Sequence, residues 1–165
     1  MEELTFGRVL RSTSAALEAV SGADAVTEAR ELVAAASGRD RRDIAALRSE
    51  PFPASAHIAL EAMIRARLDG QPLQYIVGTW DFMGLEFKVD KRALIPRQDT
   101  ETLCEAALPL IREHAYKSCL DMCCGTGCIG VALAVLAGVS VTLADISNDA
   151  LALALENADM HGVHA

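Results

Sequence analysis

The residues of this chain that are best suited to chemistry lie between Ser118 and Gly130, in the sequence SCLDMCCGTGCIG. A short apolar segment leads into Asp121, and a glycine-rich turn follows. Gly125 and Gly127 can adopt positive φ and let a ligand approach the backbone, while free N–H groups at the next helix start can hold an anionic group. Asp145 ends a second apolar run, where its carboxylate can accept hydrogen bonds from ribose hydroxyls. The pattern predicts half of a site for a nucleoside cofactor.

Two kinds of cofactor fit this loop. Gly125, Gly127 and Gly130 spell GxGxxG, the fingerprint of dinucleotide binding. Asp121 favours S-adenosylmethionine instead, because a carboxylate at the strand end repels the pyrophosphate of a dinucleotide but attracts the ammonium group of S-adenosylmethionine. We therefore favour the methyl donor over NAD. A turn that binds no ligand is the third interpretation, since GxG alone is a weak signal.

The cysteines are the next candidates for chemistry. They are Cys104, Cys119, Cys123, Cys124 and Cys128. Cys119 is expected in a strand and Cys128 at a helix start, so the set does not converge on one point, and no CxxC pair or nearby histidine completes it. We therefore predict no metal site. An odd number of cysteines, without a signal peptide, also argues against a disulfide framework.

Composition restricts the class of protein. The chain has 165 residues, of which 52% are hydrophobic, enough for the core of one or two domains. No apolar run approaches the roughly 20 residues that cross a membrane, so we expect a cytoplasmic protein. The net charge of −8 argues against broad nucleic-acid binding, which needs phosphate neutralisation. The one basic cluster is interpreted as a solvated surface and consists of Arg39, Arg41, Arg42 and Arg48.

The first part of the chain is predicted to be a bundle of four short helices. Apolar residues recur at helical spacing up to residue 20, and the second helix places Val26 on its apolar face. Asp40 is expected to cap a short third helix, and the fourth places Ile58 on its apolar face. Glycines mark two of the helix ends, at Gly22 and Gly38.

From Tyr75 the period changes to two. The segments YIVGTW and GLEFKV alternate around DFMG, which predicts a β-hairpin between the bundle and the next domain. The segment ALIPRQDTE follows, in which Pro96 favours an extended entry and Asp99 or Thr100 can cap a helix from Glu101 to Ile111.

The second half is predicted to contain two parallel strands with helices after each. Ser147 or Asn148 is expected to cap the last helix, which runs to about Met160. Parallel sheets of this kind usually have about five or six strands. We therefore expect the chain to be truncated within a Rossmann-like domain, with exposed strand edges through which copies could associate.

Several segments resemble the HemK family, the protein-glutamine methyltransferases that modify release factors. They are RARLDGQPLQYIVG, DFMGLEFKVD, LIPRQDTE, LDMCCGTGCI and ADISNDAL. The resemblance covers the whole chain, more loosely over the first fifty residues, and LIPRxDTE is its most specific part. It implies an α/β fold in three parts: a helical domain at residues 1–72 that docks a class I peptide chain release factor, a β-hairpin linker at 73–98, and the first part of a Rossmann-like, S-adenosylmethionine-dependent methyltransferase domain at 99–165.

The resemblance also implies a cofactor site. S-adenosyl-L-methionine would lie on the glycine loop, against Asp121, Cys123, Cys124, Gly125, Thr126 and Gly127. Asp145 would hold the ribose hydroxyls, and Ile95, Arg97 and Thr100 would lie near the cofactor's far side. Cys123 stands where the family usually has glycine, and we expect the end of the strand to tolerate this small side chain.

The resemblance implies methylation of the side-chain amide of a glutamine in class I release factors. The family holds that glutamine with an Asn-Pro-Pro-Tyr segment, which does not occur in this sequence, so no catalytic residue is assigned. Because alignment supplies much of the rate in such a transfer, we expect the chain alone to bind cofactor weakly and to transfer nothing. The alternatives are an NAD-dependent oxidoreductase, a glutamine methyltransferase acting on a ribosomal protein, and a non-catalytic binding module.

Overall fold

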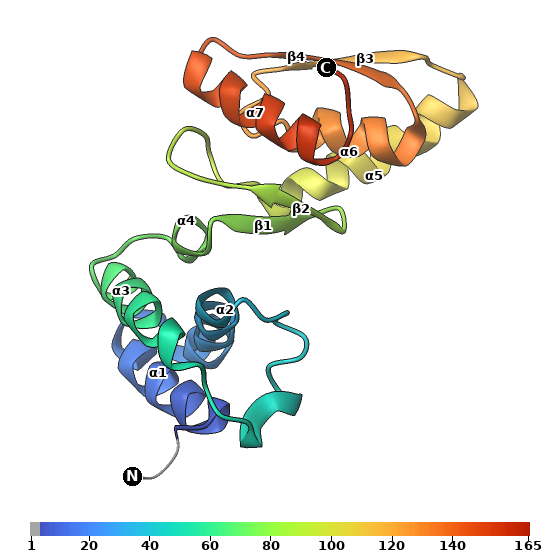
Figure 1. Ribbon diagram of the computed structural model, residues 1–165. Helices are drawn as coiled ribbons and strands as arrows, with labels where there is room; N and C mark the ends of the chain where they lie inside the picture. The colour runs from blue at the N-terminus through green and yellow to red at the C-terminus, as the bar shows by residue number, and fades with distance from the viewer. Residues whose placement is uncertain (1–3) are drawn as a thin grey trace. The chain divides into compact units, whose positions relative to one another are not determined.

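The computed structural model describes residues 4–165, and their contacts divide the chain into two compact units, one up to Val77 and one from Gly78 (Figure 1). Each unit has its own buried apolar residues. Within the described residues, no helix combines the length and the hydropathy that crossing a bilayer requires. The division into residues 1–72, 73–98 and 99–165 stays a prediction.

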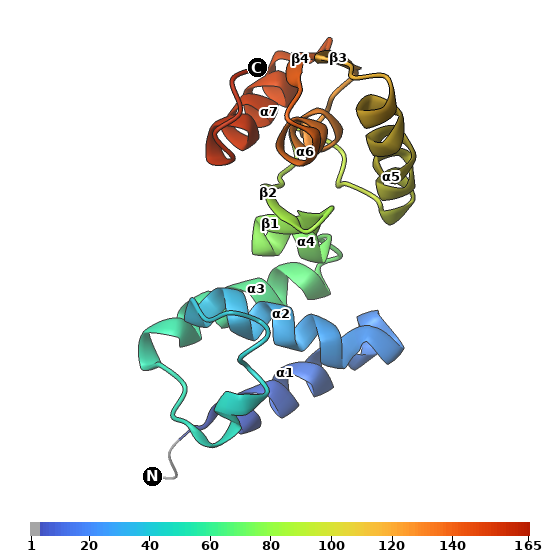
Figure 2. The same ribbon diagram turned by 90° about the vertical axis from the view of Figure 1, so that its right-hand side faces the viewer.

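The described part of the first unit consists of helices joined by turns. The α-helices are α1 Phe6–Ser21, α2 Ala25–Ser37, α3 His57–Leu68 and α4 Leu73–Val77, with 3-10 helices η1 Gly22–Asp24, η2 Ala46–Ser49 and η3 Ala54–Ala56. α1 packs along α2, and α3 contacts both (Figure 2). The side chains of Phe6, Leu17, Leu32 and Ile44 are almost fully buried between these helices.

Some details of the first unit differ from the sequence prediction. Asp40 caps no α-helix: its carboxylate accepts a hydrogen bond of 2.8 Å from the Arg42 N–H, and turns lead to the single turn of η2. The segment is too short for an isolated helix to form without packing. Val26 and Ile58 are 61% and 82% exposed, because α2 and α3 bury the adjacent stripes of residues. These placements were wrong, whereas Gly38 ends α2 in the left-handed conformation as predicted.

An ion pair joins α2 to α3 inside the first unit. Arg67 donates to both carboxylate oxygens of Glu28, at 2.8 and 3.1 Å, and the Ser21 hydroxyl donates to the same group at 2.5 Å. Burial raises the pKa of Glu28, but the hydrogen bonds from Arg67 and Ser21 outweigh it and hold this pKa below its usual value. The carboxylate therefore stays charged and fixes the end of α1 to α2 and α3.

The second unit begins with an antiparallel hairpin of β1 Thr79–Phe82 and β2 Leu85–Lys88. Met83 and Gly84 both have positive φ at the turn, as tight hairpin turns require. The hairpin confirms the prediction, but its start was wrong. Residues 75–77 belong to α4, and Gly78, with φ +85°, separates that helix from the strand.

The rest of the second unit is a parallel strand pair with helices on one side (Figures 1 and 2). Its elements are α5 Gln98–Glu113, β3 Ser118–Met122, α6 Cys128–Ala137, β4 Ser140–Ala144 and α7 Asn148–Met160. Ser118 pairs with Ser140 and Met122 with Ala144. A helical region followed by a hairpin and a parallel βαβα arrangement confirms the predicted fold class.

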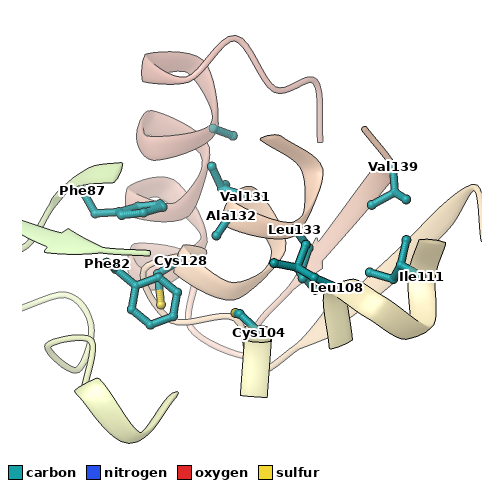
Figure 3. Close-up of a cluster of buried hydrophobic side chains, with 11 residues drawn as sticks. Phe82, Phe87, Cys104, Leu108, Ile111, Cys128, Val131, Ala132, Leu133 and Val139 are labelled. Carbon is teal, nitrogen blue, oxygen red and sulfur yellow. The ribbon is translucent and has the colours of Figure 1, made fainter. Parts of the chain in front are cut away.

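The hairpin contributes directly to the core of the second unit (Figure 3). Phe82 and Phe87 are almost fully buried, with ring centroids 6.1 Å apart, and they cluster with Cys104 of α5 and with Cys128 and Val131 of α6. Glu101 at the start of α5 accepts a hydrogen bond of 2.6 Å from the N–H of Met83 in the hairpin turn. These contacts fix the hairpin against the helices that follow the glycine loop.

Candidate cofactor site

Asp121 lies at the inner face of β3, next to the glycine loop. Its side chain is 8% exposed, and one oxygen accepts a hydrogen bond of 2.9 Å from the Gly130 N–H on α6. Burial raises the pKa of Asp121, the hydrogen bond from Gly130 opposes this, and the negative charge of Asp145 raises it further. Asp121 has no cationic partner among the described residues, so a positively charged ligand group near this carboxylate would be stabilised.

The glycine loop after β3 is shaped by three residues with positive φ. Cys123 has φ 60°, Gly125 has φ 54° and Gly127 has φ 76°. A Cβ at Gly125 would meet only the Ala93 side chain, at 3.9 Å, so this part of the loop is open to a ligand. Cys123 is exposed beside it. The end of β3 therefore turns through left-handed backbone and does not continue as an extended strand.

The other glycines of the GxGxxG pattern have packing roles. A Cβ at Gly127 would lie 3.0 Å from the Cβ of Ala154 on α7, and a Cβ at Gly130 would lie 2.7 Å from side-chain carbons of Val141 and Leu143 on β4. Gly130 thus allows α6 to approach the sheet closely. Because the fold itself requires two of the three glycines, the pattern is no argument for a dinucleotide.

Asp145 ties the glycine loop to the end of β4. Its carboxylate accepts hydrogen bonds of 2.9 Å from the N–H groups of Gly125 and Ser147, and these bonds lower the pKa of Asp145. The Cys124 N–H also donates to the Ala144 carbonyl, at 3.0 Å. Asp145 therefore stays ionised next to the open part of the loop, where its remaining lone pairs could accept ligand hydroxyls.

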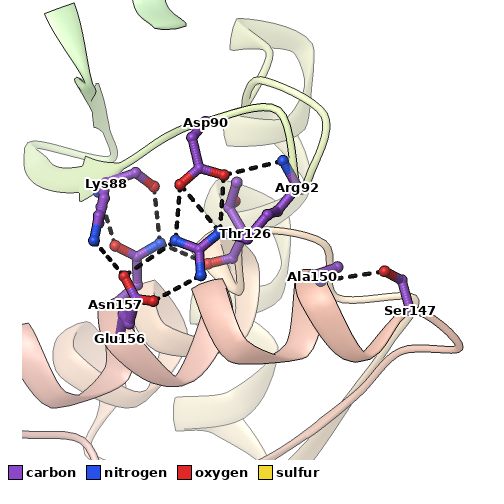
Figure 4. A network of polar contacts seen from close by, with 8 residues as sticks. All are labelled: Lys88, Asp90, Arg92, Thr126, Ser147, Ala150, Glu156 and Asn157. Carbon is purple, nitrogen blue, oxygen red and sulfur yellow. Dashed lines mark hydrogen bonds and ion pairs between the residues drawn. The ribbon is translucent and has the colours of Figure 1, made fainter.

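Asn157 on α7 is a residue of the site that sequence reasoning missed. It is fully buried, and its amide makes three hydrogen bonds (Figure 4). Its oxygen accepts from the Lys88 N–H at 2.8 Å, while its nitrogen donates to the carbonyls of Lys88 at 3.0 Å and Thr126 at 2.9 Å. One side chain thus joins the hairpin, α7 and the glycine loop. A signal was present, because Asn157 follows Ala150, Leu153 and Ala154 at the spacing of the buried helix face.

A charged network beside Asn157 fixes the segment that follows the hairpin (Figure 4). Arg92 forms ion pairs of 2.7 Å with Asp90 and with Glu156, and Lys88 also contacts Glu156. The hydrogen bonds from Arg92 and Lys88 lower the pKa of Glu156 to about 2. The network holds this segment against α7, immediately before Ala93, whose side chain faces Gly125.

The predicted site residues fall into two groups. Asp121, the loop residues 123–127 and Asp145 lie together around one turn. Arg97 and Thr100 lie at the start of α5, where the Thr100 N–H donates to the Arg97 carbonyl at 2.9 Å, and neither has a hydrogen bond to the glycine loop in residues 4–165. Arg97 lines a separate cavity of about 160 Å³ with Trp80, Phe82 and Glu101, among others. The assignment of Arg97 and Thr100 to the cofactor stays a prediction.

The cysteines lie in different surroundings. Burial raises the pKa of the Cys104 and Cys124 thiols to about 11, so both are protonated at neutral pH. Cys119 is on β3 and Cys128 begins α6. In the described part of the chain, no three His, Cys, Asp or Glu side chains are grouped so that they could hold a metal ion.

The strand, glycine loop, helix and second strand with its following acidic residue form an α/β unit, and comparison matches this unit to a methyltransferase domain. The family described as "Methyltransferase small domain" matches residues 100–165. The family described as "PrmC N-terminal domain" matches residues 8–78. Between them, the two families account for most of the chain.

Individual relatives agree with these matches. Proteins named release factor glutamine methyltransferase are 47% identical in Borreliella burgdorferi over 53% of this chain, 46% in Chlorobaculum tepidum over 64%, and 38% in Geobacter sulfurreducens over 96%. The resemblance to the HemK family is thus supported by a domain match in each half of the chain and by relatives that share one name. It spans 31%, 38% and 55% of the length of these three relatives.

Proposed function

We propose that the protein takes part in methylation of the side-chain amide of a glutamine in a class I peptide chain release factor, with S-adenosyl-L-methionine as methyl donor. The names of the relatives support the reaction and the substrate. The observation that carries the choice of cofactor is the buried carboxylate of Asp121, which has no cationic partner within residues 4–165 and precedes the loop whose backbone is open at Gly125. If the substrate is a release factor, the methylation takes place in the cytoplasm.

The residues around the loop fit a nucleoside that carries a cationic amino acid. Asp121 offers a negative charge to an ammonium group, and its raised pKa means that such a group would relieve an unfavourable ionisation. Asp145 offers carboxylate oxygens to ribose hydroxyls. S-adenosylmethionine, when bound, would supply a reactive methyl group on its sulfonium.

The chain's contribution to the reaction is binding and orientation. Cys124 is protonated at neutral pH, with a pKa of about 11, and is therefore a poor nucleophile. Asn157 and Asp145 hold the loop from two sides. No residue of this sequence is assigned to holding the acceptor glutamine, because the sequence has no Asn-Pro-Pro-Tyr segment.

The sign of the pH dependence of cofactor binding tests the assignment. Asp121 has a raised pKa, so a falling pH protonates it earlier than an ordinary carboxyl group. An α-ammonium group stays charged as the pH falls below neutrality, so the affinity for S-adenosylmethionine should fall as Asp121 loses its charge, at a higher pH than for an ordinary carboxyl group. The pyrophosphate of NADH should show the opposite trend. Isothermal titration calorimetry with each cofactor measures both.

Two variants sharpen this experiment. Asp121→Asn should weaken binding of S-adenosylmethionine about tenfold at pH 6.5 and flatten its pH dependence, because the charge-assisted contact is lost. Asp159→Asn, which removes an exposed carboxylate of α7, should leave both unchanged. Tighter binding of NADH than of S-adenosylmethionine would refute the assignment of the cofactor.

The substrate is tested by methyl transfer with radiolabelled cofactor. A protein of the relatives' length that carries this chain should label a release factor and should not label a ribosomal protein offered at the same concentration. Labelling of the ribosomal protein alone would contradict the proposal and favour a glutamine methyltransferase that acts on a ribosomal protein. The oxidoreductase alternative has no support from the matched domain, which is a methyltransferase domain.

A further inference from the structure

A groove of about 510 Å³ lies in the first unit, with walls formed by α1, α2 and η2. Small and aliphatic side chains line much of it: Leu10, Ala15, Ala25, Val26 and Ala45. Val26 is 61% exposed, although it is a large apolar residue of a helix. The groove therefore offers apolar surface that a ligand could cover.

The charged residues of the groove are mostly arginines. Arg11, Arg30 and Arg48 come from α1, α2 and η2, respectively, and all three are exposed. None has a carboxylate within ion-pair distance in residues 4–165, and Glu18 is the single acidic residue that lines the groove. The result is a local excess of positive charge in a chain with a net charge of −8.

Other arginines of the same unit are paired. Arg41 binds Glu31 at 3.2 Å, Arg42 binds Asp40 at 2.5 Å, and Arg67 binds Glu28. The basic cluster that the sequence indicated is thus divided by the structure. Arg41 and Arg42 are neutralised by neighbours, whereas Arg48 lines the groove and has no ion pair within residues 4–165.

The wall that carries Arg48 is held close to α1. A Cβ at Gly7 would lie 2.9 Å from the Arg48 carbonyl oxygen, so the two backbones are in close contact. The bridge between Thr5 and Pro51 fixes the chain just beyond η2. Packed backbone therefore fixes the start of α1 against η2 at this side of the groove.

We infer that this groove binds an acidic, amphipathic peptide segment of a protein partner. Apolar side chains of the segment would cover Val26 and its neighbours, and its carboxylates would pair with Arg11, Arg30 and Arg48. That the segment belongs to the release factor rests on the proposed function. Nucleic acid fits less well, because the unit has nine arginines against eleven acidic residues and the groove is largely apolar.

The test is fluorescence anisotropy with a labelled helical peptide that carries glutamate on one face and leucine on the other. The protein comprises residues 1–165. The double variant Arg11→Glu/Arg30→Glu should weaken peptide binding at least about tenfold, since two favourable charge pairs become repulsive. The matched variant Arg39→Glu/Arg65→Glu makes the same charge change outside the groove and should stay within about twofold. Unlabelled release factor should displace the peptide.

Four results would overturn the inference: absence of peptide binding, equal loss in both double variants, tighter binding of a single-stranded RNA, or failure of release factor to compete. Circular dichroism of each variant separates a lost contact from a lost fold. Because methyl transfer is not the readout, a failure here leaves the cofactor assignment untouched. A negative cofactor titration likewise leaves the peptide result standing.

Discussion

At the scale of single residues, the loop combines strain with tight support. Cys123 is in the left-handed region, with φ 60°, which costs a residue with a side chain about 1–2 kcal/mol. We expected the strand end to tolerate the Cys123 side chain, but the backbone at Cys123 is not extended, so the extended strand does not explain how it is tolerated. Hydrogen bonds on both sides hold the loop in this conformation, one from Cys124 to Ala144 and one from Asn157 to Thr126. That Cys123 permits cofactor binding stays a prediction.

Asn157 should be the most sensitive polar residue of the second unit. Asn157→Ala removes three hydrogen bonds and leaves backbone groups of Lys88 and Thr126 without these partners, so unfolding free energy should fall by about 2–4 kcal/mol. Urea titration followed by circular dichroism measures this. Asn148→Ala, at an exposed position of the same helix, should change stability by less than about 0.5 kcal/mol. A loss below about 1 kcal/mol for Asn157→Ala would contradict the role assigned to its amide.

At the scale of elements, α6 lies as close to the sheet as a glycine allows. Gly130 is the point of contact, and it also donates the hydrogen bond to Asp121. The same residue therefore sets both how closely α6 approaches the sheet and where the Asp121 carboxylate lies. Gly125 differs, because a Cβ there would meet nothing but the Ala93 side chain, so its conformational freedom serves the turn and the ligand side.

Alanine at these two glycines should separate folding from binding. Gly130→Ala would place a Cβ 2.7 Å from Val141 and Leu143, and overpacking should lower stability by about 1–3 kcal/mol. Gly125→Ala has space for its methyl group and should lose only about 1 kcal/mol through its left-handed backbone, yet it should bind S-adenosylmethionine more weakly. Thermal unfolding with and without cofactor measures both effects. Equal loss of stability in the two variants would contradict the distinction.

At the scale of the whole molecule, the parallel sheet has one uncovered face. Helices pack on one side, while Leu120 and Met122 of β3 are 60% and 65% exposed on the other. Parallel sheets are normally covered on both faces, and each of the two strands also has an edge that no other strand among residues 4–165 pairs with. The relatives are longer than this chain, which spans 31–55% of their length. Residues 1–165 alone therefore present surface that favours association.

We expect residues 1–165 to self-associate through this face. Leu120→Glu/Met122→Glu should shift the protein toward monomer in sedimentation velocity experiments, because charge repels at a packed sheet face. Ile58→Glu/Leu68→Glu, which changes exposed apolar residues of the first unit, should leave the distribution unchanged. A wild-type protein that is monomeric at high micromolar concentration would disprove the expectation.

The sequence by itself determined the features that depend on neighbouring residues. The end of α2 was readable because Gly38 adopts the left-handed backbone that closes a helix. The start of α7 was readable because a serine hydroxyl caps a helix, and the Ser147 hydroxyl does accept a hydrogen bond of 3.2 Å from the Ala150 N–H. The hairpin and the two strands were readable from period and turn residues. Asp121 and Asp145 were readable because both lie at the carboxyl edge of a parallel sheet, Asp121 near the end of β3 and Asp145 directly after β4.

Only the tertiary structure decided what depends on residues far apart in the chain. It selected which stripe of α2 and α3 is buried, and so exposed Val26 and Ile58. It brought Asn157 to Thr126 across 31 positions. It also paired Arg67 with Glu28 across 39 positions, whereas Arg48 has no ion pair within residues 4–165. A local pattern fixes the conformation of a segment, but the partner of a polar group and the covering of a helix face are set by packing between segments, which no local pattern contains.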